Sequence, residues 1–125
     1  MKVILVEAES DALRSWIAER PERLSSAIVA IELRRAIRRA VPERAASNDL
    51  TREADVVLSG VALMPLDERI AQVAASLDPL MLRTLDAIHV ASALSLRDVE
   101  AFVTYDARLA VAAAGAGLAV VSPGA

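Results

Sequence analysis

The sequence predicts an α/β domain in which helices cover both faces of a parallel sheet. Apolar runs of strand length alternate with segments of helical periodicity, which is the pattern of strand–helix–strand units. The 125 residues suffice for one domain, and no linker, repeat or low-complexity block divides them. Apolar residues make up 55% of the chain and charged residues 25%, so the chain can bury a core. We therefore expect residues 1–125 to form a single domain.

The first half of the chain predicts a strand between two helices. Apolar residues at helical spacing predict a helix between Ser10 and Pro21. Residues 24–31 are rich in Ile, Val, Ala and Ser, which favours a buried strand. An amphipathic helix then spans residues 33–41, and Pro42 ends it.

The second half continues the alternation. Its helical segments end at glycines or at Asp-Pro, and its strands are short and apolar. The predicted elements are a helix over 49–59, a strand over 61–66, a helix opened by Asp67, a helix over 85–96, a strand over 101–105, a helix over 107–114 and a strand over 118–122. Residues 85–96 are apolar nearly all round, so we expect an inner helix there.

The composition excludes several chemistries. Without cysteine there is no disulfide, Cys-ligated zinc, iron–sulfur cluster or thiol nucleophile, and one histidine cannot build a multi-His zinc site. The 2% of aromatic residues is too little for a base-stacking platform. A net charge of −3 gives no global attraction to nucleic acid or membrane. No apolar run approaches the length of a signal-peptide core or a membrane span, so we expect a soluble, cytoplasmic protein.

Three carboxylates stand out because they lie in or beside apolar runs, where an unpaired charge is costly to bury. Glu32 follows an apolar run, Asp86 opens the predicted inner helix, and Asp106 follows the strand over 101–105. Ligands of open parallel sheets bind at the carboxyl ends of strands. If the three acids converge, their repulsion favours a hard divalent cation, and hence phosphoryl chemistry.

Structural explanations stay open for each acid. Asp86 and Asp106 can each be an N-cap, which is the common role of Asp before a helix. Glu32 can form a surface ion pair with Arg35 on the same helix. Nothing in the spacing requires the three acids to meet.

Three segments closely resemble the internal motifs of PIN-domain ribonucleases, in particular the VapC-type toxins of toxin–antitoxin pairs. They are SAIVAIELRRA (26–36), RTLDAIHVASA (83–93) and VTYDARLA (103–110). They follow the family's order with family-like separations, and the resemblance extends over essentially the whole chain. It implies a PIN-like three-layer α/β/α fold with a central, mostly parallel sheet of four to five strands.

The resemblance implies an acidic site that binds Mg²⁺ or Mn²⁺ and cleaves RNA by metal-assisted hydrolysis. Matched residue by residue, Glu32, Asp86 and Asp106 are three of the family's four site acids, with catalytic and metal-binding roles. Thr104 and Ser26 match small polar positions that orient carboxylates or water; a hydroxyl satisfied by local backbone is the other interpretation. A homodimer and a cognate VapB-like antitoxin, whose peptide covers the acidic cleft, are also implied.

The chain departs from the family pattern at its start. PIN domains begin with a strand ending in Asp, a principal metal ligand, whereas residues 1–3 resemble the stretch just beyond that motif. We expect either an N-terminally shortened domain with weaker metal binding or a start that is not the native one. Residues 1–6, a strand by propensity, then match the family's first short helix. None of Glu7, Glu9 and Asp11 aligns with the absent ligand.

Arginines fill the polar side of the helix over 33–41. They are Arg34, Arg35, Arg38 and Arg39. This face can attract RNA phosphates or an acidic antitoxin segment, and a solvated helix face is the plain alternative. His89 lies one helical turn after Asp86; the family motif carries a His there without using it for metal, which favours a structural role.

The predicted function is a Mg²⁺-dependent endoribonuclease neutralised by an antitoxin. The alternative is a catalytically weak or inactive PIN-like module that binds its partner without cleaving RNA. A phosphoacceptor receiver domain also has strand-end aspartates, but it needs a lysine near its last strand, and the sole lysine here is Lys2.

Overall fold

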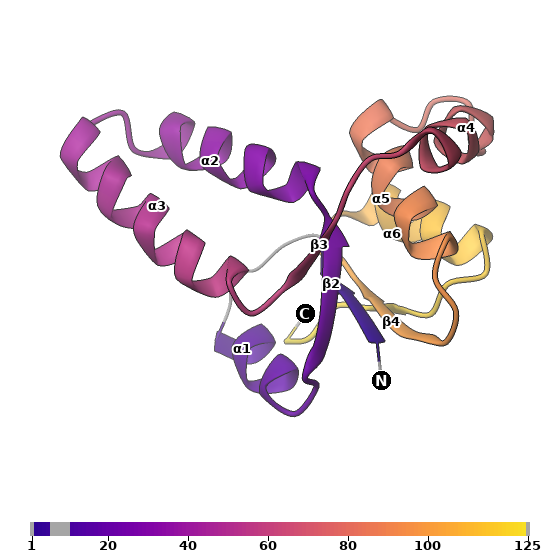
Figure 1. Ribbon diagram of the computed structural model, residues 1–125, viewed down its shortest axis with the longest axis horizontal. Coiled ribbons are helices and arrows are strands. Elements are labelled where there is room, and N and C mark those ends of the chain that lie inside the picture. The colour runs from indigo at the N-terminus through magenta and orange to yellow at the C-terminus, as the bar shows by residue number, and fades with distance from the viewer. Residues whose placement is uncertain (1, 6–10, 125) are drawn as a thin grey trace.

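A parallel five-stranded sheet in the order β3-β2-β1-β4-β5 forms the middle of the molecule (Figure 1). The computed structural model describes the backbone of residues 2–5 and 11–124 and the side chains of residues 15–124. The strands are β1 (Lys2–Leu5), β2 (Glu22–Ser26), β3 (Ala62–Met64), β4 (Val99–Val103) and β5 (Val120–Val121). The predicted α/β class with a mostly parallel sheet is confirmed.

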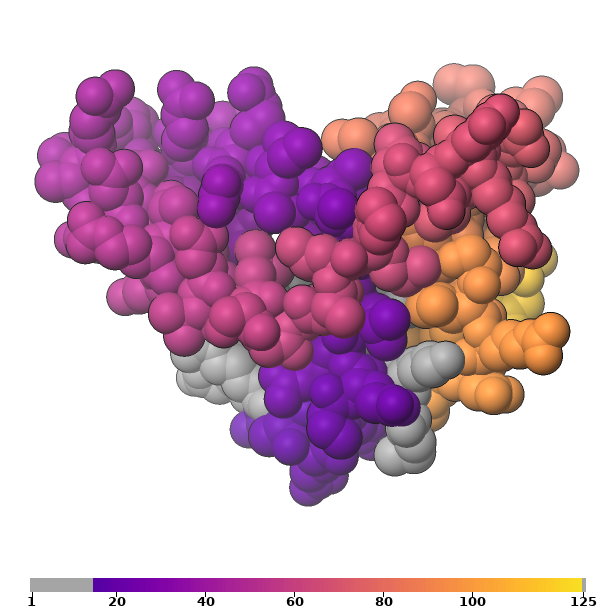
Figure 2. Space-filling view, in the orientation of Figure 1, coloured from indigo at the N-terminus to yellow at the C-terminus, as the bar shows by residue number. Residues whose placement is uncertain are grey.

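Helices lie on both sides of this sheet. They are α1 (Asp11–Ala18), α2 (Ile28–Ala40), α3 (Arg44–Leu58), α4 (Glu68–Ser76), α5 (Thr84–Leu94) and α6 (Ala107–Gly115). The α2–α3 hairpin extends to one side of the molecule, and α4, α5 and α6 gather on the other (Figure 1). In the space-filling view these two groups form lobes separated by a notch (Figure 2). Among the described residues, no helix is long and apolar enough to cross a membrane.

Alternation along β4 explains the layered core. Successive strand residues point to opposite faces of a sheet. The Val103 side chain packs with Ile17 of α1, whereas the Phe102 side chain packs with Val90 of α5 and Leu109 of α6. Phe102 and Val103 have no exposed surface, so β4 is covered on both faces. One strand therefore joins two apolar clusters on opposite faces of the sheet.

The inner helix predicted over residues 85–96 is α5, and residues 86–93 are all buried. Asp67 opens helix α4 as predicted. It is the N-cap residue, and its carboxylate accepts a hydrogen bond of 2.8 Å from the N–H of Ile70. Helix α6 ends at Gly115, and Gly117, two residues later, has a φ of +97°, a conformation that favours glycine. These local signals fix where the helices around the site begin and end.

Two sequence-based predictions are wrong. Residues 24–31 do not form one strand: β2 ends at Ser26, and α2 begins at Ile28. A short apolar run fits a buried strand and a buried helix turn equally well, which explains the error. The first residues are not a short helix either, because Lys2–Leu5 forms the central strand and pairs with both β2 and β4. The strand assignment by propensity is the correct one there.

Candidate active site

One guanidinium group joins two of the predicted site acids. Arg83 donates from Nε to Oδ2 of Asp86 at 2.9 Å and from Nη2 to Oδ2 of Asp106 at 3.1 Å. Asp86 lies in the first turn of α5, and Asp106 follows β4 directly before α6, so the acids come from different elements. Their hydrogen bonds and negative charges, those of Asp86 foremost, raise the pKa of Arg83 above its ordinary value. The two acids therefore share the guanidinium group of Arg83 as their common positive partner.

Asp106 also caps α6. Its Oδ1 accepts hydrogen bonds from the backbone N–H groups of Arg108 at 2.8 Å and Leu109 at 3.0 Å. The N–H of Leu109 is the largest cause of the lowered pKa of Asp106, and the N–H of Arg108 and the charge of Arg83 add to it. The N-cap explanation thus holds for Asp106. It fails for Asp86, because the N-cap of α5 is Arg83.

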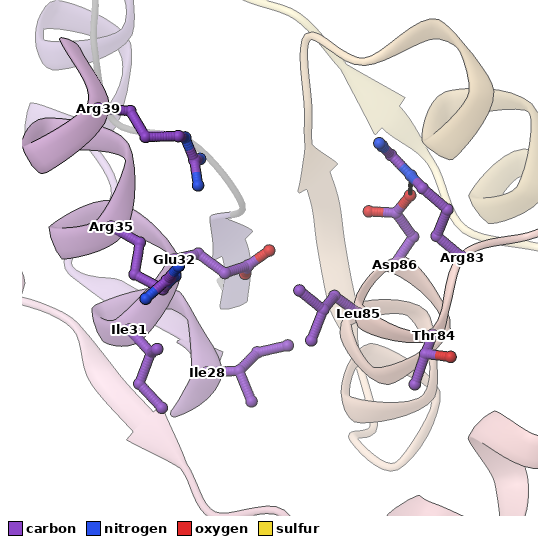
Figure 3. Close-up of a pocket in the computed structure, with 9 residues that line it drawn as sticks. All are labelled: Ile28, Ile31, Glu32, Arg35, Arg39, Arg83, Thr84, Leu85 and Asp86. Carbon is purple, nitrogen blue, oxygen red and sulfur yellow. Dashed lines mark hydrogen bonds and ion pairs between the residues drawn. The ribbon is translucent and has the colours of Figure 1, made fainter.

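Glu32 meets the buried side chain of His89. Glu32 lies in the second turn of α2, and its Oε1 is 2.5 Å from Nε2 of His89 on α5. His89 has no exposed surface, whereas the Glu32 side chain is 32% exposed. Figure 3 marks no ion pair between Glu32 and Arg35, and Glu32 contacts His89, so the surface-pair explanation does not hold among the described residues. His89 instead holds the Glu32 carboxylate against α5.

A cavity of about 440 Å³ lies between α2 and α5 (Figure 3). It brings Glu32 and Asp86 to one space, although they are far apart in the chain. Its lining residues are Ile28, Ile31, Glu32, Arg35, Arg39, Arg83, Thr84, Leu85 and Asp86. Figure 3 shows Glu32 pointing from α2 toward α5, with Arg35 beside it and Arg39 above it on the same helix. Asp106 is not among the lining residues, but it contacts Arg83, which lines the cavity.

The donor set suits a hard divalent cation. Within residues whose side chains are described, no three His, Cys, Asp or Glu groups are close enough to hold an ion together. Mg²⁺, however, is commonly bound by one or two carboxylates and completes its shell with water and phosphate oxygens. Asp86 and Asp106 already converge on one positive group, and Glu32 faces the same cavity. These residues fit Mg²⁺ or Mn²⁺, with the carboxylates as oxygen ligands.

The four arginines of α2 divide between two surfaces. Arg35 and Arg39 line the cavity between α2 and α5, whereas Arg34 and Arg38 line a second cavity of about 710 Å³ with Arg44 of α3. Arg34 forms an ion pair of 3.0 Å with Asp55. Residues four apart share a helix face, which explains this division.

The two predicted polar residues bond to local backbone. The Ser26 hydroxyl accepts a hydrogen bond of 3.4 Å from the N–H of Ile28, where β2 passes into α2. The Thr104 hydroxyl accepts one of 3.1 Å from the N–H of Asp106. Both side chains are buried. Thr104 thus fixes the backbone of a site acid rather than its carboxylate.

Sequence reasoning missed the role of Arg83. Its spacing of three residues before Asp86 was a usable signal, because such pairs lie on one helix face. Its second contact, with Asp106, spans 23 residues and has no local signature. Of the N-terminal acids, Glu7 and Glu9 lie outside the described residues, as does the side chain of Asp11.

The parallel sheet, with Glu32 and Asp106 placed beyond the carboxyl ends of β2 and β4, defines the class as an α/β domain whose candidate site lies at that edge of the sheet. The PIN domain family matches residues 2–115, and the chain belongs to this family. Its relatives in Mycobacterium tuberculosis include "Ribonuclease VapC35" (strain CDC 1551 / Oshkosh), 40% identical over 129 residues, which cover 99% of this chain and 91% of that protein. "Ribonuclease VapC46" (strain ATCC 25618 / H37Rv) is 38% identical, with 98% and 91% covered. "Ribonuclease VapC47" (strain CDC 1551 / Oshkosh) is 33% identical, with 99% and 91% covered. No solved structure matches the chain significantly.

Proposed function

We propose that the chain is a Mg²⁺- or Mn²⁺-dependent endoribonuclease of the VapC type, which hydrolyses RNA phosphodiester bonds. The observation that carries this proposal is the convergence of Asp86 and Asp106 on one cationic group, beside a cavity that Glu32 also lines. The relatives' names, which call them ribonucleases, support the same reaction class.

Asp86 and Asp106 would hold the cation directly, and Glu32, which lines the same cavity, would bind it through water. When bound, a divalent cation would supply charge stabilisation to the phosphate and to the leaving sugar oxygen, and would lower the pKa of the water that replaces it. The chain orients its own acids beforehand: His89 holds Glu32, the N-terminus of α6 holds Asp106, and burial holds Asp86.

The arginines provide contacts for RNA. Arg35 and Arg39 line the cavity between α2 and α5 and would bind phosphates next to the reacting group. Arg34 and Arg38, on the neighbouring face, extend this contact along the RNA or bind an acidic segment of the antitoxin.

The proposal includes regulation and assembly. A cognate VapB-like antitoxin places a peptide across the cavity between α2 and α5 and thereby excludes RNA. The protein acts in the cytoplasm as a single domain over residues 1–125, which pairs into a homodimer. These statements rest on family membership and on the charge of the cavity.

RNA cleavage tests the proposal. Purified protein is incubated with structured and single-stranded RNA in Mg²⁺, in Mn²⁺ and in EDTA. We expect cleavage with either metal, none in EDTA, and restoration on adding excess Mg²⁺. Asp86→Asn keeps the shape of the side chain and should remove cleavage. Equal cleavage by this variant, or cleavage that persists in EDTA, would contradict the proposal.

One observation favours a second candidate, a PIN module that binds its partner without cleaving RNA. In the described residues each acid already has a partner: Asp86 and Asp106 share the guanidinium of Arg83, and Glu32 contacts His89. This candidate predicts antitoxin binding of ordinary strength together with no metal-dependent cleavage of any RNA.

A further inference from the structure

Arg83 occupies the position that a cation between the two aspartates would need. It is the N-cap residue of α5, and its side chain is 64% exposed at the rim of the cavity. Its two contacts use Oδ2 of Asp86 and Oδ2 of Asp106. A single guanidinium thus meets one oxygen from each acid.

The two carboxylate oxygens of Asp106 make different contacts. Oδ1 accepts both backbone N–H groups that begin α6, so removing it from that position costs the helix its cap. Oδ2 is the oxygen left for a ligand outside the helix, and Arg83 holds it. A cation that binds Asp106 without opening α6 must therefore take Oδ2 from Arg83.

The charges point the same way. Two carboxylates drawn to one point repel each other unless a positive charge lies between them. Arg83 supplies that charge in the protein without metal, and its exposed side chain can swing into solvent without disturbing the core. A guanidinium and a divalent cation cannot occupy the same site together.

We infer that Arg83 is a positioning residue that competes with the divalent cation for Asp86 and Asp106, and thereby sets the metal affinity of the site. This inference rests on the proposed function. Before metal binds, Arg83 keeps the acids converged and offsets part of their charge; when metal binds, the guanidinium is released into solvent. A purely supporting role for Arg83 predicts the opposite sign, because its removal would then weaken metal binding.

Calorimetric titration with Mn²⁺ of the full chain and of Arg83→Gln tests the inference. We expect Arg83→Gln to bind Mn²⁺ about 10-fold more tightly, since the competing charge is gone. Arg35→Gln is the matched control, because Arg35 lines the same cavity and forms no hydrogen bond or ion pair with an acid among the residues drawn in Figure 3. It should change the affinity by less than about 3-fold, the size of a screened, longer-range effect. Arg83→Lys keeps the charge but cannot donate from two nitrogens in a fork. Its Mn²⁺ affinity should therefore lie between that of the unaltered protein and that of Arg83→Gln.

Unfolding temperatures give a second readout. Without metal, Arg83→Gln should unfold at a lower temperature than the unaltered protein, and saturating Mn²⁺ should remove the difference. The inference is overturned by unchanged or weaker Mn²⁺ binding in Arg83→Gln, by an equal gain in Arg35→Gln, or by a deficit in unfolding temperature that persists in Mn²⁺. If neither the unaltered protein nor Arg83→Gln binds Mn²⁺, the proposed function fails as well.

Discussion

Replacing Asp106 separates its two roles, helix cap and proposed metal ligand. Asparagine caps a helix about as well as aspartate, whereas alanine cannot accept the two N–H groups that begin α6. Asp106→Asn therefore removes the charge and keeps the cap, and Asp106→Ala removes both. The pair of variants tests whether the site depends on the carboxylate itself.

The expected magnitudes follow from these contacts. Loss of an N-cap costs about 1 kcal/mol in unfolding free energy. For a domain of this size that loss lowers the unfolding temperature by roughly 4 °C. The contact with Arg83 lies at the surface, where ion pairs add little stability. We thus expect a clear drop for Asp106→Ala and a much smaller one for Asp106→Asn.

Thermal unfolding and Mn²⁺ titration of both variants provide the assay. Both should lose Mn²⁺ affinity and RNA cleavage, although only the alanine variant loses the cap. Equal destabilisation of the two variants would refute the capping geometry. Unchanged Mn²⁺ affinity in Asp106→Asn would refute the assignment of Asp106 as a ligand, and the N-cap would then be its whole role.

Three further predictions concern the same region. His89→Gln keeps a donor for Glu32 and should retain most of the Mn²⁺ affinity, whereas His89→Leu should lose roughly 10-fold by calorimetry; equal affinities would show that His89 does not position Glu32. The folded-state pKa of Asp106 is lowered, so its contribution to stability is fully present above the ordinary value of 3.8 and is lost as the pH falls through the folded pKa. The unfolding free energy, measured by urea unfolding at a series of pH values, should therefore fall less steeply below that pH in Asp106→Asn than in the unaltered protein. Parallel pH dependences of the two proteins would contradict this. Gly117→Ala should cost about 1 kcal/mol in urea unfolding because of the positive φ, although the space beside it is open; no loss would argue against this helix end.

Local patterns predicted the helices around the site better than the strands. Asp67 and the all-round apolar character of α5 are local signals, and both indicated the correct helix starts. The boundary at Ser26 was missed, since a continuous apolar run has no period to distinguish strand from helix. A strand was predicted over residues 118–122, and the structure has one of only two residues there, Val120–Val121. Tertiary pairing, rather than propensity, limits its length.

The candidate acids could be singled out from sequence, but their partners in the structure could not. Glu32, Asp86 and Asp106 stand out because each interrupts or ends an apolar run. The pairing of Glu32 with His89 spans 57 residues, and that of Arg83 with Asp106 spans 23. Such contacts depend on how β2 and β4 lie in the sheet and how α5 packs beside them, which no local spacing encodes.

Mn²⁺ titration of the unaltered protein and of Asp86→Asn tests the central claim most directly, because Asp86 lies at the centre of the proposed site and its replacement changes charge but not shape. The account predicts one saturable binding event for the unaltered protein and its loss, or a weakening of at least about 10-fold, in Asp86→Asn. Indistinguishable titrations of the two proteins would contradict a metal site at these carboxylates.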